Sequence, residues 1–345
     1  MSTRIQQPTG ARATLKDIAA YAGVSPIAVS RVLRGEKHES QETCVKIRAA
    51  AEKLGYRPNA MARAVRNGSF GAIGLLRSAE PVAAIITPAM LWALERELLH
   101  LDLPLVIGQL PDEKLTNPKM MPRLLREWSV DGLLINYTAH APEKMISLLS
   151  EFHLPSVWLN IRLRYNCVFP EERAAMRATT EKLLSLGHRR IAFLGVPPTP
   201  NSHFSVRDRQ EEFLRVMSSA NANPQLVLCD ENADLLQVSG ELLKHRDRPT
   251  AIITCGRREA TVVIVAASRL GLELPRDLSL IVVRDENDLI GGIDVSTAFI
   301  PVFGLAACAV SMLLRRIVNP QIEEPAQGVS FHEHVGATCA PPKKR

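Results

Sequence analysis

A run of short helical signals near the N-terminus constrains the fold of this chain most, because it places two short helices on either side of a tight turn. Thr14 can cap the first helix, and Gly23 supplies the turn. Ser25 can cap the second helix, and Pro26 stands at its first position, where the missing N–H costs nothing. Apolar residues recur at helical spacing in both segments. This pattern is typical of a helix-turn-helix, whose second helix enters the major groove of DNA.

The distribution of charge argues against a small helical bundle that binds nothing. The sequence predicts a third helix after these two, capped by Ser40. Residues 1–71 hold 12 Lys and Arg against 5 Asp and Glu, a net charge of +7. The whole chain carries +6, so the remaining residues carry −1. Because the excess positive charge lies in this one region, we expect the region to bind the phosphates of a nucleic acid.

Two motifs in this region resemble a known family. LKDIAAYAGVSPIAVSRVLRG at 15–35 and LGYRPNAMARAV at 54–65 are similar, in order and spacing, to the N-terminal domain and hinge of the LacI/GalR (lactose-repressor) family of bacterial transcription regulators. The resemblance implies a hinge helix that folds when a dimer sits on DNA and that wedges open the minor groove. The family's wedge is usually Leu, and Val65 stands at that position here.

From Ala72 onward, strand and helix patterns alternate, which predicts parallel sheets with helices on both faces. Two such halves form a bilobal α/β domain of the periplasmic-binding-protein type, which closes on a ligand between its lobes. LLSLGHRRIAFLG and STAFIPVFGLAACAVSMLLRRI resemble family segments at the start of the second lobe and at a late crossover with a dimer-contacting helix.

The alternating pattern also predicts helices at 121–128 and from Arg209 to Ala220. The predicted divisions are a disordered tail at 1–13, an all-α helix-turn-helix headpiece at 14–58, a hinge helix and linker at 59–71, and a bilobal effector-binding and dimerisation domain at 72–345.

Composition narrows the class of protein. The six cysteines are scattered without a CxxC pair, which suits a reducing compartment and argues against a zinc site or a disulfide framework. The first 13 residues lack the apolar core of a signal peptide, and no apolar run is long enough to cross a membrane. We therefore expect a cytoplasmic protein with no membrane partner.

No motif in the sequence predicts catalysis or a cofactor. GxSxG, GxxxxGK[ST] and GxGxxG are all absent. His332 and His334 flank Glu333 and would share one face of a strand, but with no third ligand nearby we expect two surface histidines rather than a metal site. His188 is expected to be a buried, hydrogen-bonded histidine.

The candidate DNA contacts lie mainly on the second helix. Arg31 can bind O6 and N7 of guanine, whereas Ile27 and Ala28 can pack only on apolar groups such as thymine methyls. Hydroxyl groups more often contact phosphate. Arg34 resembles some gluconate-sensing members of the family, and a solvated arginine is an equal alternative for it. The predicted DNA-binding residues are Thr14, Ser25, Pro26, Ile27, Ala28, Ser30, Arg31, Arg34, Asn59 and Val65.

The predicted effector site departs from the sugar-binding pattern of the family. Where members carry acidic or amide groups, this chain has Asn160, Arg257 and Arg284, beside Arg209 and Asp285. Because guanidinium groups match carboxylate or phosphate, we expect an anionic effector, either a sugar acid or a sugar phosphate. The alternative is that Asp285, Glu171 and Glu172 neutralise these arginines and that no ligand binds. The predicted effector-binding residues are Asn160, Arg162, Arg209, Arg257, Arg284 and Asp285, with Arg164 converging on the same cleft.

The sequence thus predicts a homodimeric, ligand-responsive transcription regulator, a repressor in the first instance, that binds a pseudo-palindromic operator. One alternative is a constitutive DNA-binding regulator whose effector domain has lost its ligand. A second alternative is a sugar-binding protein or enzyme on the same bilobal fold, against which the headpiece and the absent signal peptide argue.

Overall fold

The chain divides into two units, Met1–Phe70 and Gly71–Arg345, each of which has its own core. The division lies within the predicted hinge and linker. The structure is a computed structural model, and it describes residues 13–33, 35–36, 39–56, 68–79, 86–137, 141–200, 202–230 and 232–343. The predicted disordered tail and hinge helix therefore lie largely outside the described residues.

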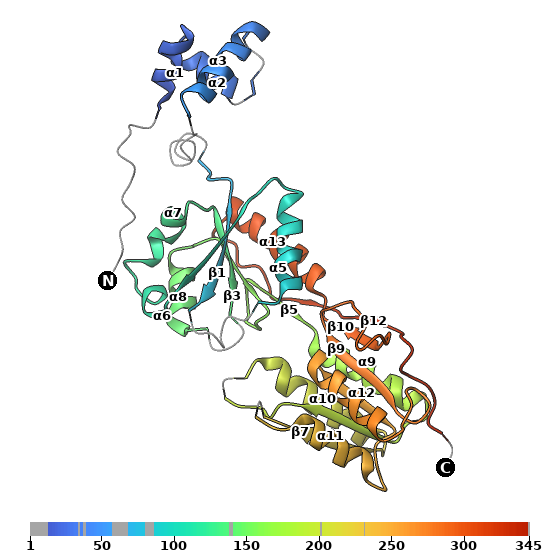
Figure 1. Ribbon diagram of the computed structural model, residues 1–345. Coiled ribbons are helices and arrows are strands. Elements are labelled where there is room, and N and C mark those ends of the chain that lie inside the picture. The colour runs from blue at the N-terminus through green and yellow to red at the C-terminus, as the bar shows by residue number, and fades with distance from the viewer. Residues whose placement is uncertain are drawn as a thin grey trace. The chain divides into compact units, whose positions relative to one another are not determined.

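Three short helices form the first unit (Figure 1): α1 (Leu15–Ala22), α2 (Pro26–Leu33) and α3 (Gln41–Lys53). Thr14 caps α1 through a capping box with Asp17, and Ser40 caps α3. Gly23 adopts a positive φ of 68° at the end of α1, where a glycine avoids steric strain. Apolar side chains from all three helices meet in one small core: Ile18, Ala19, Ala22, Val29, Val32, Ile47, Ala50 and Ala51. The predicted helix-turn-helix fold is confirmed.

The second unit begins with a lobe built on a six-stranded sheet of order β11-β5-β4-β3-β1-β2. Every strand pair recorded in this sheet is parallel. Its strands are β1 (Ile73–Ser78), β2 (Leu105–Leu110), β3 (Gly132–Asn136), β4 (Ser156–Leu159), β5 (Cys167–Pro170) and β11 (Gln327–Val329). Its helices are α5 (Pro88–Leu99), α6 (Asp112–Leu115), a 3₁₀ turn at Met121–Arg123, α7 (Leu124–Trp128), α8 (Glu143–Glu151) and α13 (Val302–Val318).

The second lobe repeats this arrangement with the sheet order β12-β10-β9-β8-β6-β7. Its edge strand β12 is antiparallel to β10, and the other pairs are parallel. Its strands are β6 (Arg190–Gly195), β7 (Asn223–Leu228), β8 (Ala251–Cys255), β9 (Ser279–Arg284), β10 (Ser296–Phe299) and β12 (His332–His334). Its helices are α9 (Glu172–Ser185), α10 (Phe204–Ser219), α11 (Leu235–Lys244) and α12 (Arg257–Arg269).

The chain crosses between the two lobes more than once (Figure 1). It passes from β5 to α9, returns from β10 to α13, and leaves again from β11 to β12. Helix α13 follows the second-lobe strands in sequence, yet its residues Leu305, Ala309 and Leu313 pack with Ile73 and Leu134 in the core of the first lobe. Elements from distant parts of the sequence thus complete each lobe, and the predicted bilobal α/β fold is confirmed.

Some elements differ from the sequence prediction. The helix predicted at 121–128 begins as a 3₁₀ turn that contains Pro122, because proline removes a backbone donor. Helix α10 begins at Phe204, ahead of the predicted Arg209, because the side chain of His203 accepts a hydrogen bond from the backbone N–H of Ser205. The short strands β5, β11 and β12 carry no clear alternation and were not predicted.

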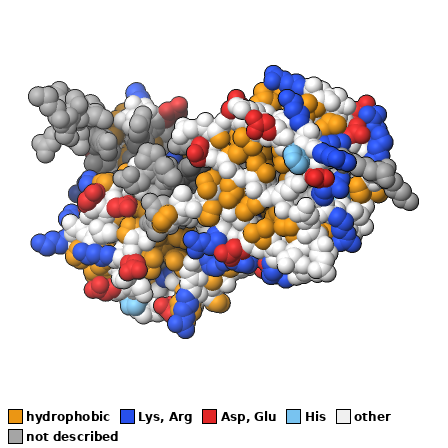
Figure 2. All heavy atoms as spheres, turned by 90° about the horizontal axis from the view of Figure 1, so that it is seen from below, with side chains coloured by type: hydrophobic (Ala, Val, Ile, Leu, Met, Phe, Trp, Pro, Cys, Tyr) orange, Lys and Arg blue, Asp and Glu red, His pale blue; other side chains and the backbone are white. Residues whose placement is uncertain are grey.

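Surface charge on the face shown in Figure 2 is mixed. Lys and Arg side chains lie among Asp and Glu side chains around an area of apolar side chains. Among the described residues, no helix is both long and apolar enough to span a membrane.

Candidate functional site

Helix α2 presents an exposed face that bears the predicted base-contacting residues. Ser25 caps the helix, since its Oγ accepts a hydrogen bond of 3.1 Å from the N–H of Ala28. Pro26, Ile27 and Arg31 are exposed, and Ile27 retains 64% of its accessible surface although it is a large apolar residue. Ile27 and Arg31 are four residues apart, so they lie on the same side of the helix. An exposed isoleucine next to an arginine is suited to a groove that offers both methyl groups and hydrogen-bond acceptors.

Other predicted DNA contacts are placed differently. Ala28 is only 8% exposed, so little of its side chain is available for the predicted contact with a base. The hydroxyl of Thr14 hydrogen-bonds to the carboxylate of Asp17 at 2.7 Å, and Ser30 is half-buried. Arg34, Asn59 and Val65 lie outside the described residues.

A cavity of about 230 Å³ lies between the lobes of the second unit. Both lobes line it, with residues that follow the carboxyl ends of the sheet strands on each side. In such α/β folds this edge is the usual ligand-binding position. Three of the six predicted effector residues, Asn160, Arg209 and Asp285, are among the lining residues. The other lining residues are Ile86, Thr87, Met90, Asn136, Glu172, His203, Ser205, Ile300, Val302 and Leu305.

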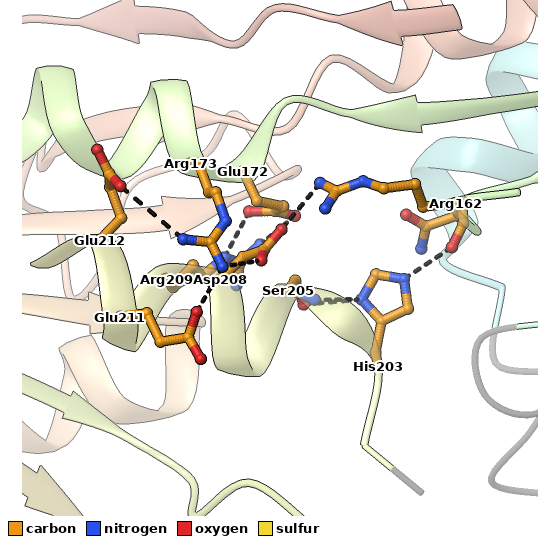
Figure 3. Close-up of polar contacts among 10 residues, drawn as sticks. Arg162, Glu172, Arg173, His203, Ser205, Asp208, Arg209, Glu211 and Glu212 are labelled. Carbon is orange, nitrogen blue, oxygen red and sulfur yellow. Dashed lines mark hydrogen bonds and ion pairs between the residues drawn. The ribbon is translucent and has the colours of Figure 1, made fainter. Parts of the chain in front are cut away.

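Arg209 is already paired within this cavity. Its Nε and Nη2 donate to the two carboxylate oxygens of Glu172 at 2.6 and 2.8 Å, and Glu172 is 2% exposed (Figure 3). Burial alone would lower the pKa of Arg209, but the charge of Glu172 outweighs burial and raises it. The thiol of Cys255 is also close to Arg209, and burial raises the pKa of that thiol. The positive charge that the sequence predicted in the cleft therefore has a counter-charge.

His203 joins the lobes at the rim of the cavity. Its Nε2 lies 2.7 Å from the backbone carbonyl oxygen of Asn160, and its Nδ1 accepts from the N–H of Ser205 at 3.3 Å (Figure 3). This arrangement requires the neutral tautomer in which Nε2 carries the hydrogen. Burial lowers the pKa of His203, which favours the same neutral form. Sequence analysis did not select His203, because a single histidine before a helix carries no recognisable motif.

Arg162 lies outside the cavity and bridges the lobes instead. Its Nη2 donates to Asp208 of α10 at 2.8 Å (Figure 3). Its guanidinium also lies over the rings of Phe169 and Phe204, with the central carbon 5.0 and 4.7 Å from the ring centroids. The structure therefore does not place Arg162 with the cavity lining, because Asp208 and the two rings hold the side chain at the junction of the lobes.

Arg257 and Arg284 are also not among the residues that line this cavity, so the structure does not bring them together with Arg209 there. Arg257 Nη1 donates to the carboxylate of Asp288, and Arg284 Nη1 donates to the same carboxylate at 2.7 Å. The shared partner Asp288 holds both side chains beside the 285–289 loop. Arg164 lines a different cavity in the first lobe.

Other histidines that the sequence singled out take part in local contacts. His188 is buried, and its ring nitrogens hydrogen-bond to Thr250 and to the carbonyl oxygen of Ala340. His334 lies 2.7 Å from Asp294. Within the described part of the chain, no group of three or more His, Cys, Asp or Glu side chains is placed to hold a metal ion.

Two family models match separate parts of the chain. Residues 14–59 match the model described as bacterial regulatory proteins, lacI family, and residues 180–339 match a periplasmic binding protein-like domain. The HTH-type transcriptional repressor PurR of Klebsiella pneumoniae subsp. pneumoniae is 28% identical over 330 residues, which cover 93% of this chain and 94% of the relative. PurR of Salmonella paratyphi B is 29% identical over 332 residues, with the same coverage. These relatives are described as transcription regulators and not as enzymes.

Solved structures show the same fold. The Lac repressor dimer bound to operator and the anti-inducer ONPF superimposes with a TM-score of 0.76 at 23% identity, covering 96% of this chain and all of that chain. The CelR–cellobiose complex superimposes with a TM-score of 0.60 at 20% identity, covering 95% of this chain and all of that chain. Both likenesses extend across the headpiece and the bilobal unit.

Proposed function

The chain belongs to the lacI family of bacterial regulatory proteins, and from that premise we propose that it represses transcription by binding a pseudo-palindromic operator as a homodimer. The observation that carries the proposal is the exposed face of α2, with Ile27 and Arg31 one turn apart. Arg31 would bind a guanine edge, and Ile27 would contact a thymine methyl. The hydroxyls of Ser25, Ser30 and Thr14 would contact phosphates and set the register of the headpiece.

The hinge contacts are part of the same proposal. Asn59 would begin a short helix, and Val65 would insert between base pairs in the minor groove. A valine wedge is shorter than leucine, so Val65→Leu should tighten operator binding by about 1 kcal/mol per monomer through the added methylene. Arg34 is proposed as a further contact at the end of α2.

The interlobe cavity would hold the effector. Its polar lining combines an arginine with two carboxylates and several amide and hydroxyl groups, which suits a small molecule that bears many hydroxyl groups. A sugar acid is the proposed class, because a single carboxylate could bind the guanidinium N–H groups of Arg209 that are not used by Glu172. A sugar phosphate is less favoured, since its higher charge would face Glu172 and Asp285.

Coupling between the two sites would follow from linkage. A ligand that binds the closed lobes better than the open lobes shifts the population towards closure, and the resulting change in DNA affinity cannot exceed this difference. The chain enters the bilobal unit at Gly71, whose N–H donates to Asp131 at 2.7 Å at the start of the first sheet. A movement of the strand ends beside Asp131 would therefore act on the segment that leads to the headpiece.

A thermal-shift panel tests the effector proposal. The panel pairs each neutral sugar with its acid and its phosphate, and a ligand at a hundred times its Kd should stabilise the fold by about 2.7 kcal/mol. The proposal predicts stabilisation by an acid, a loss of that effect in Arg209→Ala, and altered DNA binding when the acid is present. Stabilisation by neutral sugars alone would overturn the acidic class. No response to any compound would favour constitutive regulation.

A further inference from the structure

A second cavity, of about 200 Å³, lies in the first lobe and shares no lining residue with the interlobe cavity. It sits beside Ser156, where β4 begins, whereas the interlobe cavity is lined by Asn160, just beyond the carboxyl end of the same strand. The two cavities therefore lie at opposite ends of the same strand of the parallel sheet. We call the second cavity the Arg316 pocket.

Arg316 is the unusual member of this pocket. It comes from the last turn of α13 and is only 4% exposed. Its Nη1 donates to the carbonyl oxygen of Ser156 at 2.9 Å, but its Nε has no hydrogen-bond partner among the described residues. No carboxylate of the described chain lies within ion-pair distance of Arg316, although exposed Glu323 lies on the pocket wall. Burial lowers the pKa of Arg316, and the charges of Glu323 and Glu324 offset this effect only in part.

This situation contrasts with the other buried arginines of the second unit. Arg209 has Glu172 and Arg284 has Asp288 as a counter-charge, each within 2.8 Å. A buried guanidinium without a charged partner is costly, because desolvation is not offset by Coulomb attraction. Glu323 and Glu324 act on Arg316 only through their charges and make no direct ion pair with it, so the pocket can accept a negatively charged group with good hydrogen-bond acceptors.

The other residues that line the pocket indicate which chemical group the negatively charged end of a ligand would be attached to. Leu149 and the buried ring of Trp158 supply apolar surface, and the half-buried Leu163 adds to it. Arg164 is exposed at the pocket and lies over the ring of Tyr165, with its guanidinium carbon 5.1 Å from the centroid. A flat apolar group between these walls would place its charged end at Arg316. A dianion would be repelled by Glu323 more strongly than a monoanion.

We propose that the Arg316 pocket is a binding site for a small aromatic carboxylate, separate from the effector cavity. The carboxylate would accept hydrogen bonds from the guanidinium group of Arg316 where it lines the pocket, in the geometry that guanidinium favours. The ring would pack against Trp158 and Leu149. Arg164 would lie at the pocket mouth as a second positive charge.

The position of the pocket connects it to the entry of the chain into the bilobal unit. Arg316 contacts the carbonyl oxygen of Ser156, and the neighbouring carbonyl oxygen of Pro155 accepts from the N–H of Leu133 in the next strand. Two residues before Leu133, Asp131 holds Gly71. A ligand at Arg316 would therefore act on the same strand ends that lie next to the segment leading to the headpiece. We expect such a ligand to change operator affinity independently of the interlobe cavity.

Isothermal titration of the full-length protein with benzoate tests the site, with benzamide as the uncharged control and inorganic phosphate as the dianionic control. We expect saturable binding of benzoate alone, accompanied by a change in tryptophan fluorescence from Trp158. Arg316→Met should abolish binding. Because Arg316 also supports Ser156, three exposed positions provide variants that leave the core intact.

Ser150→Phe, at an exposed lining position of α8, should fill the pocket and abolish binding. Glu323→Gln should tighten binding by about threefold by removing an opposing charge, and Arg164→Ala should weaken it by a similar factor. Arg123→Ala removes an exposed arginine elsewhere in the first lobe and should leave the affinity unchanged. Equal binding of benzamide, unaltered benzoate binding in Ser150→Phe, or no saturable binding to the parent would each overturn the proposal.

Discussion

Arg162 of the first lobe and Asp208 of the second lobe lie 2.8 Å apart, and the other oxygen of Asp208 accepts from Arg173 at the same distance. One buried carboxylate thus has a partner on each side of the junction between lobes, since Arg173 belongs to α9 of its own lobe. The hydrogen bond from His203 to the carbonyl oxygen of Asn160 joins the lobes at a neighbouring point. These two contacts hold the 160–162 segment against the start of α10.

Removal of the Arg162 side chain, the partner of Asp208 from the other lobe, should loosen this junction without unfolding either lobe. Arg162→Ala should increase amide hydrogen exchange in peptides that span 160–164 and 203–208, while the unfolding midpoint changes little, because Arg162 is partly exposed and such pairs contribute about 0.2–1 kcal/mol. Arg173→Ala is the matched control, since it removes the partner within the lobe. Faster exchange at 160–164 in Arg173→Ala but not in Arg162→Ala would contradict this account.

The pair of Arg209 and Glu172 should contribute to stability as a unit. Glu172→Gln would leave the buried guanidinium of Arg209 without its counter-charge, and breaking such a pair costs about 3–5 kcal/mol. Urea unfolding of the variant should show this loss as a lower midpoint. The double variant Glu172→Gln/Arg209→Met should recover much of the loss because it removes the uncompensated charge as well. A double variant no more stable than Glu172→Gln would refute the charge argument.

Stability should decline in mildly acidic solution because His203 is held neutral. Burial lowers the pKa of His203 in the folded state below the ordinary value of 6.5, so the unfolded chain binds more protons below that value. The contribution is complete above about pH 6.5 and is lost as the pH falls through the lowered folded pKa. His188 has a pKa lowered by burial too and adds to the same slope.

Thermal unfolding between about pH 5 and pH 7 measures this slope, because most carboxylates have finished titrating there. His203→Gln keeps a donor and an acceptor without a titrating ring, so the unfolding temperature of this variant should depend less steeply on pH. A slope identical to that of the parent would show that His203 does not set the acid sensitivity.

The sequence was sufficient to predict the headpiece and the repeated α/β pattern, since capping residues and apolar periodicity are local signals. It could not predict that β11 and α13 complete the first lobe, because that depends on where distant segments return. The sequence also could not predict how the positive charges near the cleft are paired, for a related reason. The sequence offered Glu172 as one possible counter-charge, but it could not show that Glu172 pairs with Arg209 or that Arg257 and Arg284 share Asp288, because the pairs of Arg209 and Arg257 join residues more than 30 positions apart. The low exposure of Ala28 could not be predicted either, because Ala28 directly follows the exposed Ile27 on the same short helix.

The most direct test of the account measures how Arg31 contributes to DNA binding. A DNA site is first selected by the protein from a random pool, and its affinity is then measured by fluorescence anisotropy between about 50 and 200 mM salt. Arg48→Ala, which removes an exposed arginine from α3, is the control for loss of charge alone. We predict a pseudo-palindromic selected site, a steep loss of affinity with salt, and a cost of about 1–3 kcal/mol for Arg31→Ala together with relaxed preference at one base pair per half-site. Binding that is insensitive to salt, or an Arg31→Ala variant that matches Arg48→Ala in affinity and base preference, would contradict the central claim.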